Sequence, residues 1–143
     1  MKKILILVAA LFIAIISVKA QCPAHVKYTA GKMEMLDSGM NLVDSKDGAT
    51  VLETTAKGFS AGQEDHEDDS LFGTLKSVTC NWQEPYKNGK ITMVCDVHTN
   101  HEDLVGVMVT IEAVNGKITI ILHAKEYPDR IIRLPIDKYE EVK

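Results

Sequence analysis

Apolar and polar residues alternate with a period of two along much of the second half of the chain. Such alternation is typical of β-strands that bury one face in a core and leave the other at least partly in water. It predicts strands over residues 91–98, 105–112, 118–124 and 130–136. Beyond residue 20, no window of a dozen residues keeps apolar side chains at helical spacing behind a capping residue, so the pattern indicates an all-β chain.

Tight reversals connect these predicted strands. The dipeptide Asn115-Gly116 is typical of a two-residue type I′ turn, because both positions accept a positive φ. That turn sets Ile111 opposite Ile120, and the preceding loop sets His98 opposite Leu104. In both hairpins the aliphatic faces then coincide, as pairing over a common core requires.

The first half of the chain is less regular. Residues 25–36 read as one extended stretch that Gly31 breaks or bulges, residues 50–54 as a short strand, and residues 58–70 as a polar loop. Counting these segments predicts an antiparallel meander of about seven or eight strands. The meander closes either as a small barrel or as a two-sheet sandwich, and the sequence leaves both open.

The first 20 residues are typical of a cleaved signal peptide, with Lys2 and Lys3, an apolar run from Ile4 to Ile16, and Val18-Lys19-Ala20 at the cleavage site. The apolar run is shorter than the roughly 20 residues that a spanning helix needs. We therefore expect residues 1–20 to be removed and residues 21–143 to form a single all-β domain. The mature chain is expected to be secreted or periplasmic and to have no transmembrane segment.

Loss of the signal peptide makes the protein more acidic. The whole chain carries 16 Lys and Arg against 20 Asp and Glu, a net charge of −4. Removing Lys2, Lys3 and Lys19 leaves 13 basic residues against the same 20 acidic ones, a net charge of −7. Nucleic acids and anionic membranes bind basic surfaces, so we expect neither as a partner.

Export would place the cysteines in an oxidising compartment, where disulfides persist. There are three, Cys22, Cys80 and Cys95, so at least one is free or pairs between chains. If the loop between the two strands is residues 86–89, Cys80 falls opposite Cys95, near enough for a disulfide that contributes roughly 3 kcal/mol. The alternative is two buried free thiols, and in either case Cys22 is left over near the N-terminus.

One motif raises the question of catalysis. The segment from Gly58 to Gly62 matches G-x-S-x-G, the strand-to-helix turn that presents a serine nucleophile in α/β hydrolases. The chain order would allow a triad of Ser60, Asp103 and His123. Neither a parallel sheet nor a following helix is predicted, however, so we expect a flexible glycine loop and a protein that is not an enzyme.

Metal binding is not expected either. The run from Glu64 to Asp69 holds five carboxylates and one imidazole, but it lacks the ligand spacing and the glycine of a calcium loop. It is therefore read as a solvated acidic loop. His98 and His123 lie roughly 16 Å apart by the predicted register, too far to share an ion. We expect no metal and no cofactor.

The second face of the predicted sheet is moderately apolar. By the register, Val94, Met108 and His123 form one row, and Ile121 belongs to the next. Either further strands cover this face or it binds a ligand. Together with Trp82, which could form the floor of a pocket, these residues are the predicted ligand-binding set.

No motif is specific enough to name a family, so the functional hypotheses rest on the fold pattern alone. The first is an exported, non-enzymatic β-domain that binds a small apolar ligand between its sheets. The alternative is an envelope or extracellular interaction module that docks an exported protein partner through an edge strand or an outer face. The segment around Pro135 is the edge candidate, because proline removes a backbone donor. The oligomeric state is left open.

Overall fold

A computed structural model describes residues 22–98 and 104–143, apart from the side chains of residues 66–69, so the predicted signal peptide lies outside the described residues. All regular elements in the described part are strands, which confirms the predicted all-β class. They are β1 (Val26–Leu36), β2 (Leu42–Thr55), β3 (Gly58–Gln63), β4 (His66–Glu84), β5 (Asn88–His98), β6 (Leu104–Val114), β7 (Lys117–Ala124), β8 (Ile131–Pro135) and β9 (Lys138–Glu141).

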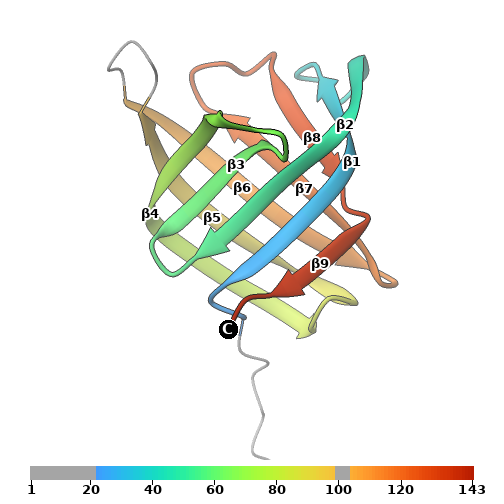
Figure 1. The fold of residues 1–143 in the computed structure, drawn as a ribbon, viewed down its shortest axis with the longest axis vertical. Helices are drawn as coiled ribbons and strands as arrows, with labels where there is room; N and C mark the ends of the chain where they lie inside the picture. Colours follow the sequence, from blue (N-terminus) through green and yellow to red (C-terminus); the bar gives the residue numbers. More distant parts are fainter. Residues whose placement is uncertain (1–21, 99–103) are drawn as a thin grey trace, which may run out of the picture.

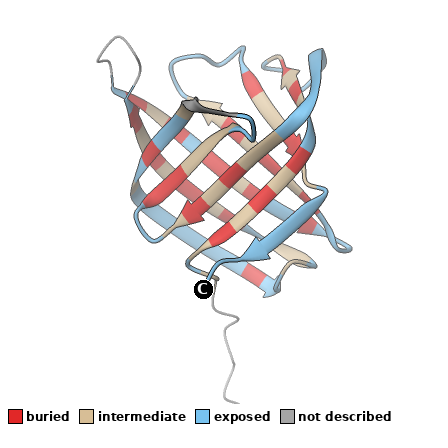
Figure 2. Cartoon of the chain, viewed as in Figure 1, coloured by how far each residue is buried: buried red, intermediate tan, exposed pale blue. Residues whose placement is uncertain are grey.

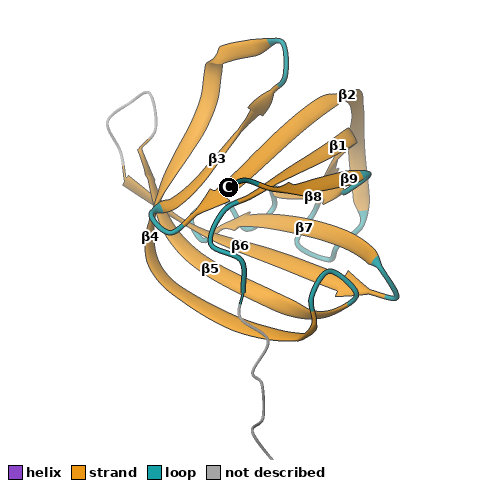
Figure 3. Cartoon of the chain, turned by 60° about the horizontal axis from the view of Figure 1, so that its bottom comes forward, coloured by secondary structure: helices purple, strands orange, loops and turns teal. Residues whose placement is uncertain are grey.

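These strands form an antiparallel meander that closes on itself (Figure 1). Each strand from β2 to β7 is hydrogen-bonded to the next, β8 pairs with β1, and β1 pairs with β2. The result is an eight-stranded barrel, which decides between the two closures that the sequence left open. The remaining strand, β9, lies against the first residues of β1, as the view of the barrel from below also shows (Figure 3).

The strand register of the second half follows the sequence prediction. His98 lies opposite Leu104, and Ile111 lies opposite Ile120. Asn115 and Gly116 form the connecting turn with φ of 51° and 81°. The bulge predicted at Gly31 is also present, as a register shift between the residues on either side of it.

The first half contains more strand than predicted. The short strand over residues 50–54 is part of the 14-residue β2, and the predicted polar loop over residues 58–70 is β3, a tight turn and the start of β4. The reason is visible in the burial: residues 42–49 of β2 are exposed on both faces, so they carry no apolar alternation although their backbone pairs with β1.

The predicted pairing of Cys80 with Cys95 is wrong. Cys80 lies opposite Ile91, and its disulfide partner is Cys22, at a Cα–Cα distance of 6.1 Å. Cys95 is a buried free thiol. Burial raises the pKa of this thiol, which keeps it protonated and unreactive.

The error arises in the turn between β4 and β5. The sequence places this turn over residues 86–89, whereas Glu84 pairs with Asn88 and the turn comprises residues 85–87. Tyr86 adopts a φ of 62° in the turn. Glycine and asparagine favour this conformation and tyrosine does not, so the sequence does not predict a turn centred on Tyr86. A register shift between Trp82 and Glu84 moves the pairing of β4 with β5 further from the predicted one.

Inward-facing side chains from all eight barrel strands form one core, and buried residues recur at every second position along the central strands (Figure 2). An aromatic cluster closes one end of the barrel. Tyr86 stacks on Tyr139 with ring centroids 4.1 Å apart and meets Trp82 edge-on at 5.8 Å. The Tyr86 hydroxyl donates a hydrogen bond of 2.6 Å to Glu141 of β9, which ties the extra strand to this closed end.

Candidate ligand cavity

At the end of the barrel opposite the aromatic cluster, the interior contains a cavity of about 450 Å³. It lies inside the ends of the strands that the β3–β4 turn and the β7–β8 loop connect. Its lining comes from seven strands and one loop: Met33, Thr50, Ala61, Gly62, Gln63, Leu71, Val107, Leu122, Ala124, Arg130, Ile132 and Leu134. Most of these side chains are apolar, so the cavity suits an apolar ligand better than water.

The deep wall of the cavity belongs to the core. Val107, Leu122 and Leu134 are buried and alternate with outward-facing neighbours on β6, β7 and β8. They hold their positions because three consecutive antiparallel strands pair in a continuous register. Backbone pairing on both sides of β7 thus fixes the relative positions of these three side chains.

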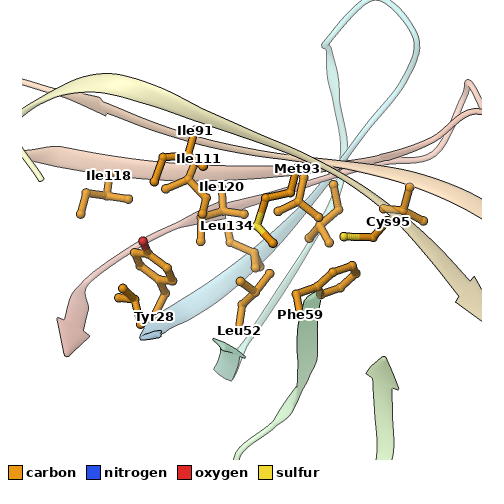
Figure 4. Packing of buried hydrophobic residues seen from close by; sticks show 14 of the residues in the cluster. Tyr28, Leu52, Phe59, Ile91, Met93, Cys95, Ile111, Ile118, Ile120 and Leu134 are labelled. Carbon is orange, nitrogen blue, oxygen red and sulfur yellow. The ribbon is translucent and has the colours of Figure 1, made fainter. Parts of the chain in front are cut away.

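Below the cavity, Phe59, Leu52 and Cys95 belong to a packed floor that adjoins Leu134 of the deep wall (Figure 4). Phe59 lies so close to β4 that a Cβ atom added at Gly73 would be 2.3 Å from its ring. Glycine at this position thus lets the ring cover the β4 backbone and separate the cavity from the closed end.

Polar groups gather only at the mouth of the cavity. Thr50 and Gln63 are paired across β2 and β3, and Arg130 is the ionisable residue of the lining. Two successive turns position Arg130: the amide of Tyr127 donates to Ala124, and the amide of Arg130 donates to Tyr127 at 3.0 Å. Pro128 favours the second turn because its fixed φ suits the position after Tyr127.

None of the five residues predicted to bind a ligand is in the cavity lining. Trp82 points into the barrel but is packed in the closed end, with 4 % of its surface exposed. The other four, Val94, Met108, Ile121 and His123, lie on the outer face of β5, β6 and β7 in the two rows that the register predicted. The rows are confirmed, and whether they bind anything stays a prediction.

The outer face has a depression of its own, of about 610 Å³, which Ile121 and Thr110 line together with a polar cluster. In that cluster, Glu34 accepts a hydrogen bond of 2.5 Å from Arg133. It also forms an ion pair with Lys32, at an N–O distance of 3.0 Å. The Arg133 hydrogen bond, followed by that of Lys32, lowers the pKa of Glu34. The depression is thus occupied by a satisfied ion pair, which makes it a less suitable apolar site than the interior.

A smaller cavity of about 240 Å³ lies at the closed end, beside the disulfide. Cys22 and Pro23 form one side of it, and Val78, Ile91 and Met93 form the other. The bond to Cys80 holds the start of the described chain against this site. It is separated from the larger cavity by the floor around Phe59.

The arrangement of Ser60 differs from that of a hydrolase nucleophile. Ser60 lies in the middle of β3, paired with Glu53 on one side and Phe72 on the other, rather than in a strand-to-helix turn. His123 is on β7, which is four strands away from β3 in either direction around the barrel. Asp103 falls outside the described residues.

Two further observations concern the described part of the chain. Among residues 22–98 and 104–143, with the unplaced side chains set aside, no three His, Cys, Asp or Glu side chains converge as metal ligands would. In the same residues, no helix is long and apolar enough to cross a membrane. The acidic run from Glu64 to Asp69 forms the β3–β4 turn and the start of β4, and the side chains of its last four residues are outside the description.

Comparisons of the chain with protein-family models, with curated proteins and with solved structures gave no match. Any proposal about the function of this protein therefore rests on its fold and on the cavity.

Proposed function

We propose that the protein is an exported, non-enzymatic β-barrel that binds a small apolar ligand inside the barrel. The observation that carries the proposal is the apolar cavity of about 450 Å³ at one end of the interior. Binding cavities for small molecules typically measure 300–1,000 Å³ and have apolar walls with a few polar groups. The Cys22–Cys80 disulfide supports the exported part of the proposal, because disulfides persist in oxidising compartments.

The energetics favour a ligand with a substantial apolar body. Burial contributes about 0.8 kcal/mol per methylene, so a chain of about ten methylenes gains about 8 kcal/mol before the loss of its own freedom is counted. A shorter chain would have little net affinity. Val107, Leu122 and Leu134 are already buried and held by paired strands, which lowers the ordering cost on the protein side.

Titration with a neutral dye whose fluorescence rises in apolar surroundings tests this proposal. Filling the cavity with Ala124→Phe should lower the affinity at least tenfold, because Ala124 lines the cavity. Met108→Ala is the matched control, because Met108 lies on the outer face of the same hairpin and pairs across from His123. Circular dichroism establishes that both variants are folded. Loss of binding in the Met108 variant alone would show that the dye binds at the outer face instead. If no apolar probe binds the wild type, the proposal is refuted.

A second candidate function is docking of an exported protein partner through a strand edge. The supporting observation is that β9 is exposed and, within the described residues, pairs on one side only, with β1. The edge predicted around Pro135 differs from this one, because β8 is paired on both sides. Replacing Tyr139 with proline would remove a backbone donor from β9. It should abolish partner binding in this candidate and leave dye binding intact.

A further inference from the structure

We propose that the ligand of the apolar cavity is an amphiphile with an acidic head group, a fatty-acid-like molecule whose carboxylate meets Arg130 at the mouth. This inference rests on the proposed function and specifies its ligand class. The apolar tail would lie against Leu122 and Leu134, and the head group would stay near solvent.

The distribution of polarity in the lining carries the inference. Apolar side chains form the deep wall, and the three polar lining side chains lie beside the mouth: Gln63 ends β3, Thr50 pairs with it from β2, and Arg130 is in the β7–β8 loop. A neutral apolar ligand would leave these groups with no function in binding. A molecule with one polar end matches the gradient, because its polar end can hydrogen-bond at the mouth without being buried.

The charge at the mouth selects the sign of the head group. Arg130 contributes a permanent positive charge to the lining, and guanidinium can bind a carboxylate through two parallel hydrogen bonds. Its Cζ atom lies 6.0 Å from the centroid of the Tyr127 ring, which restricts the side chain on one side. The ion pairs formed among the described side chains do not include Arg130.

Acidic side chains of the surroundings act in the opposite direction. Glu64 and Asp65 of the β3–β4 turn, and Glu126 and Asp129 of the β7–β8 loop, are exposed near this end of the barrel. None of the four lines the cavity, whereas Arg130 does. A carboxylate in the cavity would contact Arg130 and none of these four side chains, so we expect its attraction to Arg130 to dominate.

Competition among three probes of equal chain length tests the head group. Dodecanoate, dodecanol and dodecyltrimethylammonium, each below its micelle concentration, displace the bound neutral dye. We expect dodecanoate to bind about fivefold more tightly than dodecanol, the upper range for an exposed ion pair, and dodecyltrimethylammonium to bind most weakly. High salt should reduce the advantage of dodecanoate.

Variants assign the preference to one residue. Arg130→Gln should equalise dodecanoate and dodecanol, and Arg130→Lys should retain part of the difference. Lys125→Gln is the control, because it removes a positive charge from the same loop at a residue outside the lining. Equal affinities in the wild type, a preference for the cation, or a preference that survives Arg130→Gln would overturn the inference while leaving the apolar site intact. Failure of all three probes and of the dye to bind would instead refute the proposed function itself.

Discussion

The disulfide between Cys22 and Cys80 should provide a large share of the stability of this protein. The two cysteines are 58 residues apart in sequence, so the bond removes much of the freedom of the unfolded chain. In the chain-entropy description, a loop of this length contributes about 4 kcal/mol. Domains of this size have unfolding free energies of about 5–15 kcal/mol, so the loss is a substantial fraction of the total.

The test is urea unfolding of oxidised wild type, Cys22→Ser, Cys80→Ser and the double variant. With a urea dependence of about 2 kcal/mol per molar, each variant should unfold at about 2 M lower urea than the wild type. All three should behave alike, because each removes the same bond. Reduction of the wild type should give the same shift.

Cys95 provides the control, because its thiol is free and buried. It should resist alkylation in the folded, oxidised protein and react as one thiol per chain in denaturant. Cys95→Ala should lower stability independently of the two disulfide variants. The Cys22–Cys80 assignment would be refuted if the urea midpoints of the Cys22 and Cys80 variants were unchanged. It would also be refuted if the unfolded oxidised wild type had two reactive thiols in addition to that of Cys95.

Two further predictions concern the outer face and the floor of the cavity. Because its ion pairs depress the pKa of Glu34 in the folded state, the wild type should be more stable than Glu34→Gln above about pH 4.3, and this advantage should vanish as acid titrates the folded carboxyl. Urea midpoints at pH 3 and pH 7 measure it, and a difference independent of pH would contradict the role of the pair with Arg133. Gly73→Ala should destabilise the protein by about 1–3 kcal/mol, because the new Cβ would be 2.3 Å from the Phe59 ring. Gly106→Ala is the matched control, since its Cβ would meet nothing within 4 Å, and its stability should stay within about 0.5 kcal/mol of the wild type. Equal effects of the two glycine variants would argue against the packed floor.

The second half of the barrel was predictable because turn chemistry and hydrophobic pattern agree there. Asn115-Gly116 specifies a two-residue turn, and the aliphatic faces of β6 and β7 coincide only in the register that this turn imposes. The first half lacks this agreement. Residues 42–49 are exposed on both faces, and β3 carries small and polar residues beside Phe59, so period-two alternation is absent where strands exist.

The site was less predictable than the fold, for a related reason. The moderately apolar face of β5–β7, which the sequence suggested as a ligand-binding face, is the outer face of the barrel. The opposite, aliphatic face lines the interior. Part of the cavity lining, Ala61, Gln63 and Leu71, comes from the segment around the predicted polar loop. Only closure of the barrel brings these residues opposite Leu122 and Leu134, and single-strand patterns do not contain that information.

The most direct test of a ligand site inside the barrel is the anomalous X-ray scattering of crystals soaked with 12-bromododecanoate. We predict a bromine peak among Val107, Leu122 and Leu134, with density for the chain running toward Arg130. A peak on the outer face beside Met108, or an interior without density at saturating ligand, would contradict the account.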